Sequence, residues 1–187
     1  HGDGHSRLVF SLHSARFNPG IMISTSRDRQ IIIWDRLKKI QYLSISSLGF
    51  VPSPYNSVTN LHSGYPYCMD SNPCESNCYA IGVGDNTIRI WKPKPTNPYY
   101  SVLLWKGFTS KITSVRWKPN SEVDLAYGTE DGRVALIDVD SKKHTPFSSA
   151  SVGIISDIHF AKNDVGEEGL VLWALGADGF IRVYDVS

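Results

Sequence analysis

The sequence has few of the features that mark secreted, membrane or disordered proteins. Its 187 residues include only three cysteines. No run of about 18 apolar residues occurs, so no membrane span is expected. Residues 1–20 lack the apolar core of a signal peptide, and an odd cysteine count without one argues against a disulfide scaffold and for a reducing compartment. With 41% hydrophobic residues and a net charge of +1, the chain is expected to fold.

An excess of one charge sign and the common enzyme motifs are also missing. Because 19 Lys+Arg balance 18 Asp+Glu, any nucleic-acid site must be a local patch. There is no phosphate-binding Gly-rich loop with Lys-Ser/Thr, no nucleophile elbow and no His-Glu-x-x-His, so neither an enzyme nor a cofactor is expected. Cys68, Cys74, Cys78 and His62 leave zinc open as an alternative to unlinked thiols. Zinc is disfavoured, because structural sites usually have a tighter cysteine pair.

A repeated segment dominates what is present. Each copy has small residues, an Asp, a turn residue and an apolar/polar alternation that ends in Trp, Tyr or Ile six residues after the Asp. The copies are Ser24–Asp35, Gly82–Lys92, Tyr127–Asp138 and Ala174–Asp185, with their Asp at Asp28, Asp85, Asp131 and Asp178 and their final ring or Ile at Trp34, Trp91, Ile137 and Tyr184. The Asp positions lie 57, 46 and 47 residues apart. This spacing predicts four copies of one supersecondary unit, with a long loop in the second.

The chemistry of each copy predicts a β-hairpin. Alternation of period two places Ile88 and Ile90 on one face of a strand. Asp followed by Gly or Asn favours a tight turn, because these residues tolerate positive φ. Further strands are predicted before each hairpin at Leu8–Ala15, Pro66–Asp70, Ile112–Trp117 and Ile154–Phe160, and after it at Ile40–Ile45 and Val102–Trp105. Each unit therefore has four strands, and no segment shows a convincing helical period.

The Asp-turn-strand-Trp-Asp pattern, with Gly4-His5 before the first strand, resembles the WD-repeat β-propeller family. The resemblance implies an all-β fold of four four-stranded antiparallel blades, at residues 1–40, 41–95, 96–140 and 141–187. It also implies structural roles, in which a His, a hydroxyl, the turn Asp and the strand Trp form a buried hydrogen-bonded set. The residues at these positions are His5, Asp28, Trp34, Asp85, Trp91, Asp131 and Asp178. Because WD rings most often have seven blades, we expect the chain to be part of a larger double propeller.

The candidate binding residues lie where two kinds of segment meet in a propeller blade. The hairpin between the second and third strands and the segment that leads into the first strand emerge at the same rim. Arg7, Arg29, Tyr65, Tyr67 and Lys111 fall in such segments. Aromatic rings beside guanidinium groups suit single-stranded RNA, because bases stack on the rings and Arg pairs with phosphates or base edges. The alternatives are that the tyrosines pack between blades and that the cations are only solvated.

Within the family, several rarer tracts resemble an RNA-binding member from the survival-of-motor-neuron complex. These are HSRLVF (5–10), STSRDR (24–29), SGYPY (63–67), AIGVGDNTIRIW (80–91), WKGFTSKIT (105–113) and AYGTEDGRVALID (126–138). The resemblance implies binding to the uridine-rich Sm site and methylguanosine cap of small nuclear RNA, with Tyr65 as a stacking ring. It further implies partners among the other subunits of that complex, in cytoplasm and nucleus, and neither DNA nor a membrane. Two residues depart from the pattern: Ser156 stands in place of a Tyr, and Pro66 in place of a small residue.

A second function class stays open at this stage. WD propellers are most often protein-interaction scaffolds, and such a scaffold would grip a peptide at the same rim. Arg and Tyr also dominate the energetically important positions of protein–protein interfaces. The residue types alone therefore do not separate RNA binding from peptide binding.

Overall fold

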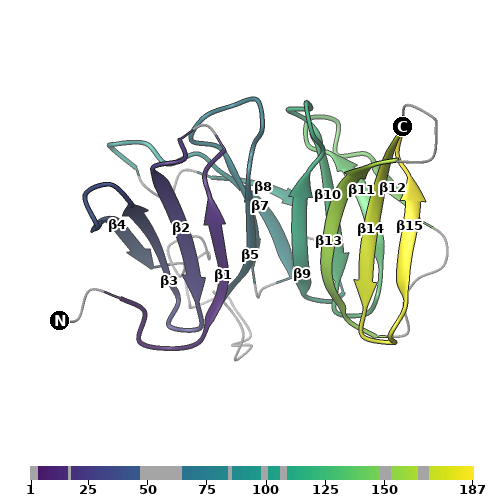
Figure 1. The fold of residues 1–187 in the computed structure, drawn as a ribbon, viewed down its shortest axis with the longest axis horizontal. Coiled ribbons are helices and arrows are strands. Elements are labelled where there is room, and N and C mark those ends of the chain that lie inside the picture. The colour runs from purple at the N-terminus through teal and green to yellow at the C-terminus, as the bar shows by residue number, and fades with distance from the viewer. Residues whose placement is uncertain are drawn as a thin grey trace.

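Four antiparallel β-sheets make up the computed structural model (Figure 1), which describes residues 4–16, 18–46, 65–83, 86–97, 101–105, 109–147, 153–163 and 169–187. The first blade contains β1 (Val9–Ser14), β2 (Ile21–Ser26), β3 (Gln30–Asp35) and β4 (Ile40–Ser46). The second contains β5 (Pro66–Ser71), β6 (Tyr79–Val83), β7 (Thr87–Trp91) and β8 (Ser101–Trp105). The third contains β9 (Ile112–Trp117), β10 (Asp124–Thr129), β11 (Val134–Asp138) and β12 (His144–Pro146), and the fourth β13 (Ile155–Lys162), β14 (Leu170–Gly176) and β15 (Ile181–Asp185). These described ranges contain no helix, and so none that could cross a membrane.

The all-β architecture of four antiparallel sheets is confirmed, but the blade limits differ from those expected. The outer strands β4, β8 and β12 end at residues 46, 105 and 146, beyond the expected limits of 40, 95 and 140. The repeat marks the central hairpin of each blade strongly, whereas its outer strand has only a short polar alternation. Among the described residues the fourth sheet has three strands, not the expected four.

The turn between the second and third strand of each blade depends on one backbone conformation. The residue after the turn Asp has positive φ in all four copies: 63° at Arg29, 61° at Asn86, 90° at Gly132 and 84° at Gly179. Gly and Asn adopt this left-handed region readily, whereas other residues pay a steric cost. Of these four residues, Arg29 is therefore the one whose residue type does not favour the positive φ of the turn.

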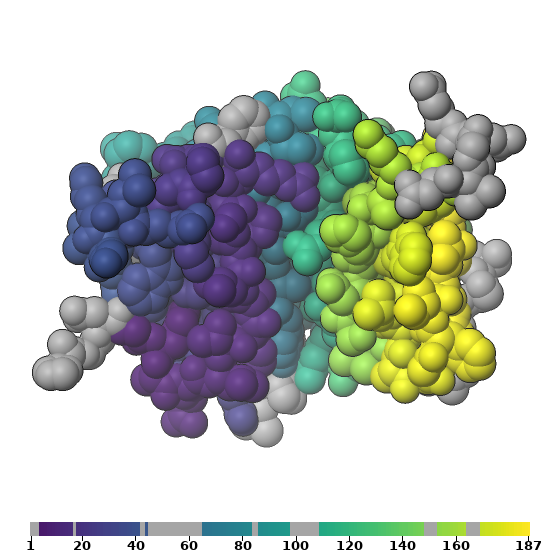
Figure 2. All heavy atoms as spheres, in the orientation of Figure 1, coloured from purple at the N-terminus to yellow at the C-terminus, as the bar shows by residue number. Residues whose placement is uncertain are grey.

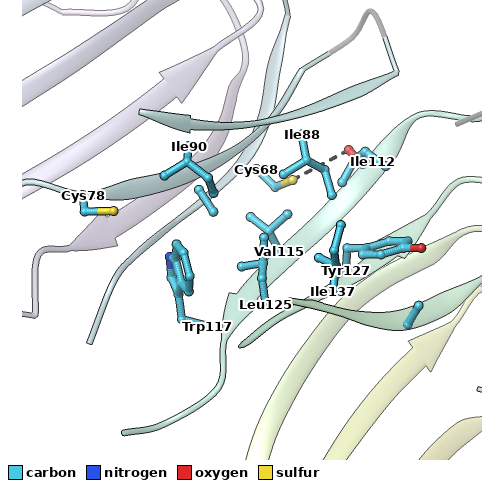
Figure 3. Close-up of a cluster of buried hydrophobic side chains, with 12 residues drawn as sticks. Cys68, Cys78, Ile88, Ile90, Ile112, Val115, Trp117, Leu125, Tyr127 and Ile137 are labelled. Atoms are coloured by element: carbon cyan, nitrogen blue, oxygen red, sulfur yellow. Dashed lines mark hydrogen bonds between the residues drawn. The ribbon is translucent and has the colours of Figure 1, made fainter. Parts of the chain in front are cut away.

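Neighbouring blades pack through the innermost strand of the following blade. Strand β5 packs on β1 and β2, β9 on β5 and β6, and β13 on β9 and β10. Figure 3 shows the cluster between the second and third blades, where Ile88, Ile112, Val115 and Trp117 meet. All four side chains are at most 2% exposed, so this junction is a dry core.

The four blades form an open arc in Figure 1. The first and fourth blades lie nearer the viewer, and the second and third lie behind them. The innermost strands β1, β5, β9 and β13 face the inside of this arc, because each packs against its neighbour there. Residues on these four strands can therefore act together even though up to about 150 residues separate them in the chain.

Candidate functional site

Each innermost strand carries an irregularity at the same register position. The pairing shifts between Val9 and Ser11 in β1, between Pro66 and Cys68 in β5, next to Ile112 in β9, and between Ile155 and Asp157 in β13. Such a β-bulge leaves one residue out of the pairing and turns its side chain. The extra residues are Phe10, Tyr67, Thr113 and Ser156, and all four line one cavity of about 280 Å³.

Three aromatic rings gather at the first two blades. The ring centroids of Phe10 and Tyr67 are 4.9 Å apart, and Tyr65 lies 6.1 Å from each of them. Phe10 is tilted by 51° and 54° against Tyr65 and Tyr67, and the two tyrosines meet edge to face at 85°, so none of the three pairs is stacked. We call Phe10, Tyr65 and Tyr67 the aromatic cluster. Sequence reasoning missed Phe10, although it ends the HSRLVF tract that was used for the family resemblance.

Two cations contact the aromatic cluster, Arg29 from before the tyrosines in the sequence and Lys111 from after them. The guanidinium carbon of Arg29 lies 4.8 Å from the centroid of Tyr65, and Nζ of Lys111 lies 5.6 Å from that of Tyr67. Both distances are within the range of cation–π attraction. Lys111 Nζ is also 3.9 Å from a carboxylate oxygen of Glu130, so a negative charge lies beside this cation. The structure thus brings four of the five predicted RNA-binding residues together.

The fifth predicted residue, Arg7, is held beside the same turn through its backbone. Its carbonyl accepts a hydrogen bond from Ser26 Oγ at 3.2 Å, and the next carbonyl, of Leu8, accepts one from the N–H of Arg27 at 2.9 Å. The side chains of Arg7 and Arg27 are exposed. Arg7 therefore adds positive charge near the turn without being fixed on the aromatic cluster.

The hydroxyl of Tyr67 stays protonated at neutral pH. Burial raises the pKa of Tyr67 to about 12, helped by the negative charge of Glu130 and by Tyr65 and opposed by Arg27. A neutral phenol can donate a hydrogen bond as well as accept one. The aromatic cluster and the two cations beside it therefore offer stacking faces, a hydroxyl donor and positive charge within one small region.

The predicted structural set of the first blade forms a chain of hydrogen bonds. Nε1–H of Trp34 donates to Ser24 Oγ at 2.8 Å, and Ser24 Oγ is 2.6 Å from Nε2 of His5. His5 Nδ1 is 3.0 Å from Asp28 Oδ2, which also accepts the N–H of Ser6. Burial opposes ionisation of Asp28, but the N–H groups of Gln30 and Ser6 and the His5 ring lower its pKa. This set ties the segment carrying Arg7 to the turn carrying Arg29.

The corresponding residues of the other blades have different partners. Trp91 is fully buried against Tyr79, with ring centroids 5.3 Å apart, and Asp85 lies outside the described residues. The N–H of Asp131 donates to Ser110 Oγ at 3.0 Å. Asp178 instead binds the guanidinium of Arg182, with a shortest N–O distance of 2.7 Å. Only in the first blade does the described structure show the complete His-hydroxyl-Asp-Trp set.

A buried carboxylate, which sequence reasoning also missed, lies behind the cavity. Asp70 is 0% exposed and accepts the N–H of Trp117 at 2.8 Å and Nη2 of Arg16 at 3.2 Å, while Nη1 of Arg116 lies 3.7 Å away. Burial raises the pKa of Asp70, against the opposing effect of Arg16, the Trp117 N–H and Arg116. Asp70 thereby links three blades. Its register equivalents are His13, Arg116 and His159, so no carboxylate recurs at this position and the repeat pattern hides it.

His13 contacts the same carboxylate from the first blade but does not form an ion pair with it. Its Nε2 lies 2.8 Å from Ser71 Oγ and 3.2 Å from the Ser71 backbone nitrogen, and Asp70 Oδ1 is 3.5 Å away. Burial lowers the pKa of His13 to about 4, and Arg116 and Arg16 act in the same direction. We therefore assign His13 as a neutral ring that packs the first blade onto the second.

The three cysteines lie in different surroundings. Cys68 is buried at the junction in Figure 3, where its Sγ donates to the carbonyl of Ile112 at 3.7 Å. Cys78 is buried and Cys74 is exposed, and burial raises the pKa values of Cys68 and Cys78 to about 12, which disfavours the thiolate that binds metal. Within the part of the chain that is described, no three His, Cys, Asp or Glu residues are grouped to hold a metal ion. His62 lies outside that part.

Comparison with known proteins agrees with the hydrogen-bonded set and the four sheets. The family model described as "WD domain, G-beta repeat" matches residues 2–35, which contain His5, Ser24, Asp28 and Trp34. The chain belongs to the WD-repeat family. Among solved structures, that of the computationally designed Ika4 protein superposes with a TM-score of 0.64 at 17% identity. The superposition covers 99% of this WD-repeat chain and 95% of the designed chain. At this low identity it shows a similarity of fold alone.

Curated relatives share more of the sequence. The WD-repeat chain is 34% identical over 151 residues to Gem-associated protein 5 of Homo sapiens, covering 79% of this chain and 9% of that protein. It is 35% identical over 144 residues to component of gems protein 5 of Dictyostelium discoideum, covering 73% and 10%. Histone acetyltransferase type B subunit 2 of Gibberella zeae is 26% identical over 72% of this chain. The chain thus spans about a tenth of the length of the first two relatives.

Proposed function

We propose that the aromatic cluster and its cations bind single-stranded RNA. The observation that carries this proposal is the contact of Arg29 and Lys111 with the rings of Tyr65 and Tyr67. A base that stacks on Tyr65 lies beside a guanidinium group that can pair with a phosphate or a base edge. The near-neutral charge of the chain is compatible with this mode, because a few placed groups are sufficient for readout of unpaired bases.

The backbone of Arg29 supports a functional role for its side chain. In the other three copies Asn or Gly occupies this left-handed turn position, whereas Arg29 adopts a φ of 63° at a steric cost of about 1–2 kcal/mol. Such strain clusters at ligand sites, and although Lys39 and Lys142 also have positive φ, only Arg29 of these three contacts the aromatic cluster in the described structure. If this residue only had to face solvent at the turn, Asn would be equally suitable.

The likeness to Gem-associated protein 5 supports a specific kind of RNA. On the resemblance set out from the sequence, the substrate is small nuclear RNA with a uridine-rich Sm site and a methylguanosine cap. The chain would then act with other subunits of the survival-of-motor-neuron complex in the assembly of spliceosomal particles, in cytoplasm and nucleus. No catalytic step and no cofactor are part of this proposal.

Fluorescence polarisation with labelled single-stranded RNA tests the proposal. Capped uridine-rich RNA is compared with a purine-rich RNA of equal length. Tyr65→Ala should weaken binding of the uridine-rich RNA by roughly 5- to 150-fold, since a stacked base contributes about 1–3 kcal/mol. Tyr65→Phe should retain most of the affinity because it keeps the stacking face. Arg29→Asn should also weaken binding, while its turn keeps a residue suited to positive φ.

Arg36→Ala is the matched control for loss of an arginine. Arg36 follows β3, at the end of the first blade opposite to the β2–β3 turn, and its Nη1 donates to the carbonyl of Pro19 at 3.0 Å. Its loss should leave RNA affinity unchanged. Equal affinity for the two RNAs, or wild-type affinity in both Tyr65→Ala and Arg29→Asn, would refute RNA recognition at this rim and leave peptide binding as the function to test.

A further inference from the structure

Charge is distributed unevenly around the aromatic cluster. On the first blade, the side chains of Arg7 and Arg27 are exposed, and none of the ion pairs between described residues includes either of them. Backbone hydrogen bonds keep the two arginines on adjacent segments. The carboxylate of Asp28, next to Arg27 in the sequence, is only 7% exposed and contacts the His5 ring. The first blade thus presents arginines whose neighbouring carboxylate is turned inward.

The third blade pairs each cation at the same rim with a carboxylate. Nζ of Lys111 is 3.9 Å from Oε2 of Glu130, and Nε of Arg133 is 3.4 Å from Oδ2 of Asp131. The N–H of Glu130 donates to the carbonyl of Lys111 at 2.9 Å, so the backbone keeps these two residues together. Their side chains are 49% and 22% exposed, so a ligand can reach both. The charge on this side of the rim is balanced.

The tyrosines of the second blade lie between these two sides. Lys111 Nζ is 5.6 Å from the ring centroid of Tyr67. The negative charge of Glu130 adds to the effect of burial in raising the pKa of Tyr67 to about 12, so Glu130 also lies close to this ring. In Figure 1 the β2–β3 turn lies at the lower end of its strands, and Figure 2 shows the first blade, in purple, along this lower edge. The rings therefore separate a positive side from a charge-balanced side.

We propose that a base stacked on the aromatic cluster turns its Watson–Crick edge toward Lys111 and Glu130, while the sugar–phosphate backbone passes Arg7 and Arg27. This inference rests on the RNA-binding function proposed above. Phosphates are attracted to the exposed arginines, whereas Glu130 repels them from the third blade. An ammonium group only donates hydrogen bonds and a carboxylate only accepts them, so the pair fits a base edge with an acceptor next to a donor. Glu130 thereby determines base specificity.

Uracil fits this donor–acceptor pair better than cytosine does. The Watson–Crick edge of uracil has an acceptor, a donor and an acceptor in order, so it presents an acceptor beside a donor whichever way the ring faces. The edge of cytosine has a donor followed by two acceptors, which match the pair in one orientation only. Proteins distinguish unpaired bases through hydrogen bonds to these edges. A two-bond contact of this kind discriminates between bases by roughly fivefold or more.

Fluorescence polarisation with uncapped uridine-rich and cytidine-rich RNAs of equal length, at several salt concentrations, tests this assignment. The wild type should prefer the uridine-rich RNA by roughly fivefold or more. Glu130→Gln should remove most of this preference, because an amide both donates and accepts, and it should not lower the salt dependence of binding. Arg7→Gln and Arg27→Gln should weaken both RNAs by the same factor. Each should lower the slope of log affinity against log salt by about 0.7.

Two variants at the opposite rim are matched controls. Glu75, which is 44% exposed, lies 2.9 Å from Nζ of Lys92, so Glu75→Gln breaks a comparable ion pair away from the aromatic cluster. Lys38, which is 74% exposed between β3 and β4, provides loss of a cation in Lys38→Gln. Neither change should alter affinity, base preference or salt dependence.

The outcomes separate this inference from the function on which it rests. Full uridine preference in Glu130→Gln, or a changed preference instead of a changed salt slope in Arg7→Gln and Arg27→Gln, would overturn the assignment. A wild type that binds through Tyr65 without distinguishing the two RNAs would overturn this inference alone. A wild type that binds neither RNA, or unchanged binding in Tyr65→Ala, would overturn the proposed function together with it.

Discussion

Gly128→Ala tests the blade-packing mechanism most directly. Gly128 lies in β10 and faces the fourth blade. A Cβ added to it would lie 2.5 Å from Cγ2 of Ile155, 2.9 Å from Ile155 Cβ and 2.7 Å from Ser114 Oγ. Ordinary carbon contacts begin near 3.4 Å. The inner strand of the fourth blade must therefore move by about 1 Å, which shifts the whole junction.

The expected cost follows from these distances. Overpacking of this kind typically destabilises by about 1–3 kcal/mol, whereas replacing Gly by Ala in a strand gains about 0.5–1 kcal/mol from backbone entropy. The φ of Gly128 is not among the positive values, so no backbone strain is added. The net loss in free energy of unfolding should be about 1–2 kcal/mol, measured by urea denaturation.

Two further variants decide whether the clash is the cause. Ile155→Ala removes Cγ2, the nearest of the three atoms, so it should relieve part of the clash, and the double variant with Gly128→Ala should show a favourable coupling of about 1 kcal/mol. Ile155→Val keeps Cγ2 and should give no such coupling. Gly4→Ala, where nothing lies within 4 Å, should be neutral. If Gly128→Ala is as neutral as Gly4→Ala, close approach of the blades is not what requires glycine.

Two other predictions concern the first blade. Trp34→Phe removes the Nε1–H bond to Ser24 and should lower the free energy of unfolding by about 1 kcal/mol, which thermal denaturation would detect; no change would mean that the bond contributes nothing. Stability should also fall between pH 6.5 and about 4, because the unfolded chain protonates His13 first while the folded chain holds its pKa near 4. The loss should be at most about 3 kcal/mol, and partly offset by Asp70, whose raised pKa has the opposite sign. His13→Gln should flatten this slope, and an unchanged slope would contradict the assignment.

Local rules were sufficient for the parts of the fold that depend on neighbouring residues. Period-two alternation predicted β7 and β9, and the Asp-Gly pairs predicted turns in which Gly132 and Gly179 have positive φ. The outer strands β8 and β12 lie beyond the predicted blade limits of 95 and 140, because their pairing depends on the strand before them rather than on a pattern of their own.

The candidate site was only partly accessible to such rules. Tyr65 and Tyr67 were identified by their position before a strand, but Phe10 sits in an alternating strand where a core role is the default. Its side chain joins the aromatic cluster because a β-bulge changes the face on which it lies. Nothing in the alternation of β1 marks that extra residue. Asp70 was missed for a related reason, since Arg16 and Arg116 reach it from other blades.

By itself, the sequence determined the strands, the hairpin turns and the repeat, because these depend on short-range backbone preferences and a recurring spacing. The set of His5, Asp28 and Trp34 followed from the family resemblance. Only the tertiary structure decided that Arg29 lies over Tyr65, 36 residues away, and that Phe10 packs against Tyr67 of the next blade. Both depend on how one blade packs against the next. That packing is set by side-chain volumes at each junction, such as Gly128 against Ile155, which no local pattern encodes.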